Sequence, residues 1–275
     1  MEGIKLMKKE IEYSAERIQY LKRQKKNKFS VVFWRVALLV VLIGVWEAFA
    51  NLGLIDPFIT SSPSRVVKTV GSLFKNDNFA YHIGVTLYET LTGFIITVII
   101  GYSVALVLWW SEKTRKILEP YIVVLNSLPK IALGPIIIVW FGSGEKAIIF
   151  MTFLIGIIVA IMTMLNGFLA TDKNKILLLR SFGATKWQIL IKLVVPGSLS
   201  TLISMLKISV GMAWIGSIMG EYLVSRAGLG YLIVYGGQVF KLDLVMASTV
   251  VLCVLATLMY IAVAALEKAI IKYKA

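Results

Sequence analysis

Residues 147–169 read AIIFMTFLIGIIVAIMTMLNGFL, an apolar run with no charged side chain. A helix that crosses a bilayer needs about 20 such residues, because about 30 Å of hydrocarbon is crossed at about 1.5 Å per residue. The whole chain is 58% hydrophobic, above the roughly 45–50% of soluble domains. The run therefore predicts a transmembrane helix, and the composition predicts that most of the chain lies in a membrane.

Six apolar stretches reach spanning length. The third is the weakest, because several prolines and Lys130 interrupt it. The expected fold class is therefore an all-α membrane protein with about six transmembrane helices. The expected spans cover roughly 31–54, 84–110, 117–141, 146–169, 197–222 and 244–270.

Basic residues indicate the orientation of the spans, because Lys and Arg are retained on the cytoplasmic side of a membrane. The net charge of +14 is spread over the gaps between apolar runs, which argues against a nucleic-acid-binding face. Most of the 29 Lys and Arg residues fall in alternate gaps, so both termini are expected to be cytoplasmic. The basic gaps are 1–30, 111–116, 170–196 and the residues after 267.

The chain divides into a basic cytoplasmic tail over 1–30 and one transmembrane domain over 31–275, and no internal repeat is evident. In the tail, apolar residues fall near one helical face among basic residues. This pattern is typical of a helix lying on a membrane surface. A solvated tail that only fixes topology is an equally open interpretation. The apolar positions are Ile11, Ala15, Ile18 and Leu21.

The segment from about 171 to 196 predicts two short helices around a turn. Residues 176–182 are strong helix formers, and Gly183 can adopt the positive φ that ends a helix. Thr185 and Gln188 have the spacing of a capping box, which opens a second helix. Pro196 lacks an N–H and is expected to mark a break before the fifth span. The segment should therefore form a compact helical knob on the cytoplasmic side.

The knob resembles the cytoplasmic "EAA" loop of ABC importer permeases. It shares the run Arg180-Ser181-Phe182-Gly183-Ala184, followed at the family spacing by Leu193 and Pro196. The glutamate that often begins the motif is replaced by Leu177. Further landmarks are similar to the nitrate/sulfonate/taurine branch, in which a basic residue is usual near the position of Glu89. These landmarks include Trp46-Glu47, Ser62-Pro63-Ser64, Leu128-Pro129-Lys130, Gly220-Glu221-Tyr222 and Gly228-Leu229-Gly230-Tyr231.

The resemblance implies a type I ABC importer permease fold, with a coupling helix between the fourth and fifth spans. In that family the loop docks on an ATP-hydrolysing subunit and receives its motion. The implied ATPase-coupling residues are Leu177, Arg180, Ser181, Phe182, Gly183, Ala184 and Pro196.

The same resemblance implies an assembly in a bacterial cytoplasmic membrane. The expected partners are two ATP-binding subunits that carry ATP and Mg, a second permease copy that usually makes a homodimer, and an extracytoplasmic solute-binding protein. The expected substrate is a small organic or inorganic anion such as a sulfonate, taurine or nitrate. A thiamine-precursor pyrimidine or riboflavin is the alternative for the same architecture.

The sequence lacks the motifs that several kinds of chemistry require. No Gly-x-x-x-x-Gly-Lys-Ser/Thr loop is present to cradle nucleotide phosphates, so hydrolysis is expected in another chain and no cofactor in this one. The spans lack the dense carboxylates and histidines of a proton relay, which argues against an autonomous secondary transporter. His82 is the only histidine, and without a nearby cluster of donors it predicts no metal site.

Two lysines lie within expected spans. A lysine such as Lys207 costs about 2.5–3.5 kcal/mol at the centre of a span unless it faces protein or water. Lys207 is therefore expected to face inward, either in a translocation pathway or gate or in a structural pair, and the same reasoning applies to Lys130. Because Pro129 removes a backbone donor, Asn126 and Ser127 are candidate cavity-lining residues, with a simple proline kink as the alternative.

The fifth span carries the remaining candidates. Glu221, at its outer end, is a candidate gate residue, although a hydrated carboxylate at the end of a span is the favoured interpretation. Gly216 and Gly220 allow close helix packing within one subunit or between two. Ser204 and Lys207 share a helix face, so an intramembrane enzyme is a distant alternative, although polar packing explains the pair equally well.

Overall fold

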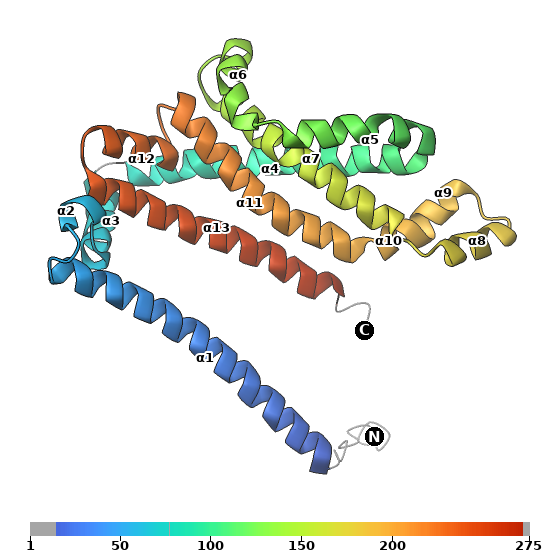
Figure 1. Ribbon diagram of the computed structural model, residues 1–275, viewed down its shortest axis with the longest axis horizontal. Coiled ribbons are helices and arrows are strands. Elements are labelled where there is room, and N and C mark those ends of the chain that lie inside the picture. Colours follow the sequence, from blue (N-terminus) through green and yellow to red (C-terminus); the bar gives the residue numbers. More distant parts are fainter. Residues whose placement is uncertain (1–14, 77, 272–275) are drawn as a thin grey trace, which may run out of the picture. The chain divides into compact units, whose positions relative to one another are not determined.

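The computed structural model describes residues 15–76 and 78–271, and every regular element in this part of the chain is helical (Figure 1). The chain separates into two compact units, residues 1–64 and 65–275. Among the described residues, five helices are long and apolar enough to cross a membrane, or up to six if one sharply bent pair counts as a single span. The prediction of an all-α membrane protein is confirmed.

The first unit is dominated by α1. This helix is uninterrupted, so no break separates the expected tail from the first span, and its part Phe29–Asn51 has spanning length. Near its end Glu47 accepts hydrogen bonds from the backbone N–H and the hydroxyl of Ser64, at 2.9 and 2.8 Å. Ile11 lies outside the described residues, and the placement of the tail on a membrane stays a prediction. The helices of this unit are α1 (Ala15–Asn51) and α2 (Pro57–Thr60).

The second unit is organised around α7 (Glu145–Leu169), which packs along both α4 (Phe79–Trp110) and α11 (Leu199–Val224) (Figure 1). Small residues permit this close approach. A Cβ added to Gly216 would lie 2.5 Å from the Cα of Thr152 in α7. The Gly216 and Gly220 pair therefore packs within one subunit. The helix that comes before α4 in the chain is α3 (Pro63–Asn76).

The third expected span is broken rather than straight. It consists of α5 (Glu112–Ser127), a 3₁₀ turn η1 (Lys130–Leu133) and α6 (Gly134–Phe141), with a bend of 86°. Leu128 is extended, as the residue before a proline tends to be, and Pro129 cannot donate a helical hydrogen bond. The break thus follows from these two adjacent positions.

The last two helices form a hairpin. The short helix α12 (Leu229–Gln238) packs against α13 (Leu242–Ile271). A salt bridge of 2.6 Å between Arg65 and Asp243 joins the start of α13 to α3. This hairpin places the N-terminus of α12 beside α4 and α11.

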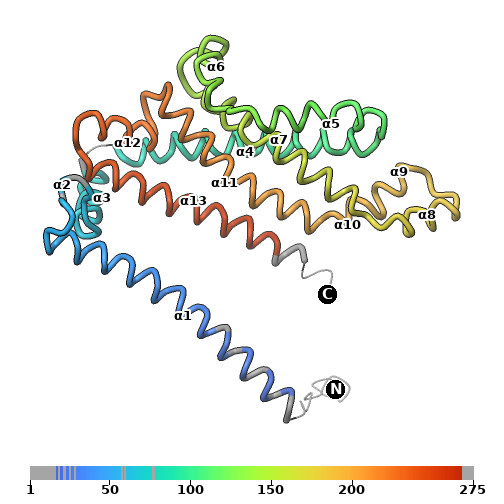
Figure 2. The backbone as a smooth tube through the Cα atoms, in the orientation of Figure 1, coloured from blue at the N-terminus to red at the C-terminus, as the bar shows by residue number. Residues whose placement is uncertain are grey.

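The knob turns between α8 and α9, and from α9 an almost continuous helical path leads into α11 (Figure 2). An interruption does come before the fifth span, because Ser198 separates α11 from α10, the short helix that contains Pro196. A π-helix, η2, comes directly before α10, and i→i+5 turns of this kind accommodate an extra residue without ending a helix. The elements of the knob are α8 (Lys173–Ser181), α9 (Lys186–Ile189), η2 (Leu190–Val194) and α10 (Val195–Gly197).

Candidate functional site

The turn of the knob is fixed by Gly183, which has φ +78°. Its N–H donates to the Arg180 carbonyl at 2.9 Å, and the next N–H, of Ala184, donates to the Leu179 carbonyl at 3.0 Å. This pair of bonds is the Schellman arrangement, which satisfies the last carbonyls of a helix around a left-handed residue. The expected role of Gly183 as the end of α8 is confirmed.

The second helix of the knob begins with the expected capping box. The Gln188 N–H donates to the Thr185 hydroxyl at 3.3 Å, and the Thr185 N–H donates to the Gln188 side-chain oxygen at 2.8 Å. Two backbone donors that lack helical partners are thereby satisfied. Together with the Gly183 turn, this box gives the knob a defined shape that does not depend on a partner.

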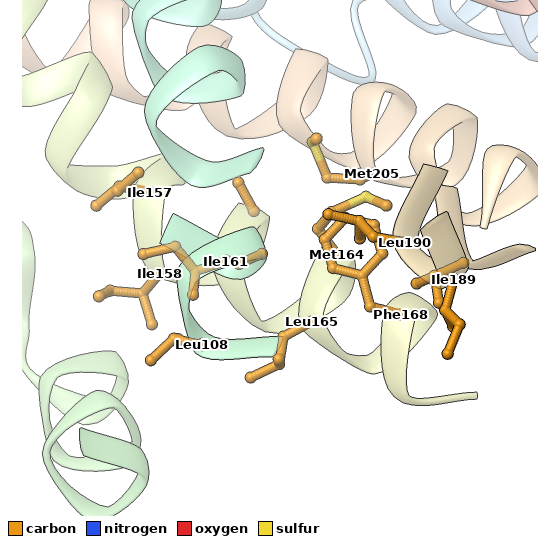
Figure 3. Close-up of a cluster of buried hydrophobic side chains, with 13 residues drawn as sticks. Leu108, Ile157, Ile158, Ile161, Met164, Leu165, Phe168, Ile189, Leu190 and Met205 are labelled. Carbon is orange, nitrogen blue, oxygen red and sulfur yellow. The ribbon is translucent and has the colours of Figure 1, made fainter. Parts of the chain in front are cut away.

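The knob is anchored to the ends of the neighbouring spans. The Lys186 ammonium donates to the Trp110 carbonyl and lies over the Trp109 and Trp110 rings, at 5.8 and 5.2 Å from their centroids. Beneath it, Ile189 packs in a buried cluster with Phe168 of α7 (Figure 3). A displacement of the knob must therefore displace the ends of α4 and α7, because tightly packed interiors transmit strain.

The knob also presents large apolar side chains on its surface. The exposed fractions are 67% for Leu177, 54% for Leu178 and 76% for Phe182. Exposed apolar groups of this kind are typical of surfaces that contact another protein, a ligand or a membrane. Arg180 is exposed beside them, whereas Ser181 donates to the Leu178 carbonyl at 2.8 Å. Leu178 is not among the coupling residues that the family resemblance implied, although it is exposed beside Leu177.

Lys207 is held in a salt bridge. Its ammonium lies 2.5 Å from a Glu267 carboxylate oxygen and links α11 to α13. Of the two interpretations of Lys207, the structure therefore supports the structural pair, with Glu267 as the partner. The Ser204 hydroxyl donates to the Ser200 carbonyl at 3.0 Å, so Ser204 and Lys207 each bond elsewhere and do not form a catalytic pair.

The three candidates at the broken span lie together at its bend. The Lys130 ammonium donates to the Asn126 carbonyl at 3.4 Å, and the Ser127 hydroxyl donates to the Val123 carbonyl at 3.2 Å. No described hydrogen bond or ion pair joins them to Lys207 or to Glu221. Irregular backbone at membrane depth needs a protein or water neighbour, so this bend remains a candidate lining of a pathway.

Glu221 is not hydrated, so the favoured expectation for it is wrong. Its side chain is only 2% exposed, and one oxygen accepts from the N–H groups of Gly230 at 2.6 Å and Tyr231 at 3.3 Å. These donors belong to the first turn of α12, whose N–H groups have no helical acceptor. The sequence could not reveal this contact, because it depends on the folding back of residues 225–231.

Side chains of α4 complete the same cap. The Thr86 hydroxyl accepts from the Leu229 N–H at 2.8 Å, and His82 Nδ1 accepts from the Gly228 N–H at 3.0 Å. Glu89, one turn further along the same face, lies within hydrogen-bonding reach of Glu221. We call His82, Thr86, Glu89 and Glu221 the outer cap.

The sequence interpretation did not identify Glu89 as a site residue, although its position within an apolar span could have indicated one. A carboxylate within an apolar span is costly and is usually functional or paired. The sequence interpretation noted only that a basic residue is usual near this position in similar proteins. The structure shows instead that Glu89 is 2% exposed and faces a second carboxyl group.

Comparisons with known proteins agree with this architecture. A family model described as the binding-protein-dependent transport system inner membrane component matches residues 93–272. The chain is 26% identical over 238 residues to the taurine transport system permease protein TauC of Escherichia coli, covering 85% of this chain and 86% of that protein. It is 29% identical over 192 residues to the formylaminopyrimidine transport permease protein ThiX of Halalkalibacterium halodurans, covering 70% and 76%.

The fold also matches a solved transporter. The MetNI methionine ABC transporter, in an inward-facing conformation, gives a TM-score of 0.63 at 22% identity and covers 70% of this chain and 95% of that chain. The family match extends from the middle of α4 through the end of α13 and includes the whole knob. The chain therefore belongs to the family of binding-protein-dependent transport system inner membrane components, the membrane permeases of ABC importers.

Proposed function

We propose that this chain is the permease subunit of an ATP-driven importer of a small anion, with sulfonates such as taurine as the leading class and nitrate as an inorganic member. The observation that carries the coupling part is the knob around Gly183, which is anchored on the spans and exposes an apolar face. Family membership supports import that depends on a binding protein, and the similarity to TauC supports the sulfonate class.

In this proposal an ATPase subunit covers Leu177, Leu178 and Phe182 of the knob. ATP binding can shift the permease between inward-open and outward-open states only if it favours one of these states over the other. The buried contacts of Ile189 with Phe168 give that shift a route into α7, and the nearly continuous path through η2 gives it a route into α11.

The proposed assembly contains two copies of this chain, most simply as a homodimer, with two ATPase subunits and an extracytoplasmic binding protein. Five or six helices enclose too little space for a solute path, so the pathway is shared between the two copies. Both termini face the cytoplasm in this arrangement. ATP and Mg belong to the ATPase subunits, because this sequence has no phosphate-binding loop.

A thiamine-precursor pyrimidine is the second candidate substrate, and the similarity to ThiX favours it. The charge in the spans does not separate the two classes, because the Lys207 ammonium is already neutralised by Glu267. Lys130 has no carboxylate partner among the described residues. We therefore expect the negative charge of a bound anion to interact with Lys130 in preference to Lys207.

The test reconstitutes the chain with its cognate ATPase and measures which solute-loaded binding protein stimulates ATP hydrolysis. Stimulation by a taurine-loaded protein supports the sulfonate class, and stimulation only by a pyrimidine-loaded protein supports the alternative. Gly183→Pro should abolish the stimulation, because proline fixes φ near −65° and cannot form this turn. Gly183→Asn is the matched control, since asparagine tolerates the left-handed region. Full stimulation in the proline variant, with normal membrane insertion, would overturn the coupling role.

A further inference from the structure

Two carboxyl groups face each other in the interior of the second unit. Glu89 of α4 and Glu221 of α11 are each 2% exposed and lie within hydrogen-bonding reach of one another. Neither forms a salt bridge among the described residues. Two adjacent ionised carboxylates would repel strongly in such a site, because burial removes the water that screens them.

The hydrogen-bond pattern shows where a proton is needed. One oxygen of Glu221 accepts from Gly230 and Tyr231, whereas Glu221 Oε1 and Glu89 Oε2 have no partner in the described part of the chain. Ionised carboxylates only accept hydrogen bonds, so a bond between the two groups requires one of them to be protonated. A shared proton removes the repulsion and supplies the missing donor.

A metal ion does not fit the same place. No group of three or more His, Cys, Asp or Glu side chains that could hold a metal is found among the described residues. Two carboxyl groups alone also supply fewer ligands than Mg²⁺ or Ca²⁺ requires. The ligand that suits this pair is therefore a proton.

A cavity of about 340 Å³ reaches Glu89, next to residues 143–145 and 224–227. It is lined by Glu89 and, among others, by Tyr81, Glu145 and Arg226. Water in this cavity would give a proton access to Glu89 without opening the bundle. The other titratable or charged side chains around the pair are His82, Tyr81, Glu145, Tyr222, Arg226 and Tyr231.

We propose that Glu89 and Glu221 form a proton-binding site whose proton holds the first turn of α12 onto α4 and α11. With the proton in place, Glu221 stays between Glu89 and the N–H groups of Gly230 and Tyr231. When the proton leaves, the two carboxylates repel, Glu221 moves away, and the first turn of α12 loses its acceptor. The site thus makes the closure of residues 228–231 dependent on pH.

Linkage gives the size and the sign of this effect. When Glu221 moves away, the site opens to the adjoining cavity and water reaches Glu89, so both groups then behave as exposed glutamates, which are ionised above about pH 4.3. The closed pair therefore binds one more proton than the released pair above that pH. The equilibrium constant for release should therefore rise about ten-fold for each pH unit, until the closed pair also loses its proton. Closure is strongest at low pH and is lost as the pH rises.

Hydrogen–deuterium exchange of the full chain in lipid nanodiscs tests this without substrate or ATPase. Protection factors, corrected for intrinsic exchange, should fall about ten-fold per pH unit for the amides of Leu229, Gly230 and Tyr231. Glu89→Gln should remove this dependence, because the glutamine amide donates to Glu221 without a proton. Glu145→Gln is the matched control, since it removes a carboxylate from the same cavity but not from the pair, and its slope should stay.

Two outcomes would overturn the proposal. One is a flat pH profile for these three amides in the unaltered chain, which would mean that no proton is linked to closure. The other is a slope that persists in Glu89→Gln, which would assign the titration to another group such as His82. Glu221→Gln serves as a second variant if Glu89→Gln does not insert, because a glutamine there can also accept from Gly230 and donate to Glu89.

Discussion

At the scale of single residues, the first turn of α12 is satisfied by side chains from other helices. The N–H groups of Gly228, Leu229 and Gly230 donate in turn to His82, Thr86 and Glu221. A helix start usually finds its acceptors in its own N-cap residue, yet Gly228 has no side chain to offer. The outer cap therefore fixes the position of α12 on the spans as well as its hydrogen bonds.

Thr86→Val tests this cap at one hydrogen bond. The change keeps the shape of the side chain but leaves the buried Leu229 N–H without an acceptor, which should cost about 1–3 kcal/mol of unfolding free energy. Thr86→Ser retains the hydroxyl and should recover most of this loss. Equilibrium unfolding in mild detergent measures both variants, and equal stability of the valine variant and the unaltered chain would contradict the prediction.

At the scale of helices, α7 and α11 lie close together because two glycines of α11 have no side chain at the contact. A Cβ on Gly216 would lie 2.5 Å from the Thr152 Cα, a backbone atom that cannot turn aside. Gly220 meets Ile148 in the same way, with the Ile148 Cα at 3.0 Å. These two glycines therefore set the distance between the helices that the knob connects.

Gly216→Ala should push α7 and α11 apart and destabilise the fold by about 1–3 kcal/mol, the range typical of overpacking. Gly211→Ala is the matched control in the same helix, because a Cβ there meets no atom within 4 Å. The control should be neutral or slightly stabilising, since alanine favours a helix. Thermal unfolding of the solubilised chain compares the two variants, and a loss of similar size in both would point to helix propensity or another contact.

The sequence predicted those helices and turns whose formation depends on residues that are neighbours in the chain. Apolar length identified α4, α7 and α11, and the positive φ of Gly183 followed from its place after a helix-forming run. The prolines indicated a weak third span, but their positions alone did not give the size of the bend, which is 86°. Glu221 was misjudged for the same reason, because its partners Glu89 and Gly230 come from segments that hydropathy does not bring together.

At the scale of the whole molecule, the distribution of basic residues predicts how the chain is oriented in the membrane. The knob carries several Lys and Arg residues, and the proposed docking of an ATPase requires it to be cytoplasmic. The even number of crossings, with the broken helix counted as one span, then returns the C-terminus to the side of the tail. Orientation and coupling thus rest on the same segment.

Tag accessibility checks this orientation. A tag placed before residue 1 and another after residue 275 should both be protected in intact cells and should become accessible only after the inner membrane is opened. A tag inserted next to Arg226, in the connection between α11 and α12, is the internal control and should be accessible from outside. Exposure of the C-terminal tag in intact cells would contradict the topology and the cytoplasmic position of the knob.

The π-helix η2 has a consequence for how such permeases can diverge. It lies within the knob, before α10 and α11, and its hydrogen bonds span one residue more than those of an α-helix. The extra residue is accommodated by a local widening, so deleting one residue, for example Lys192, would return this turn to α geometry and leave the rotation of the knob about the helix axis nearly unchanged. Insertions and deletions of a single residue can therefore accumulate at this turn without altering how the spans are packed.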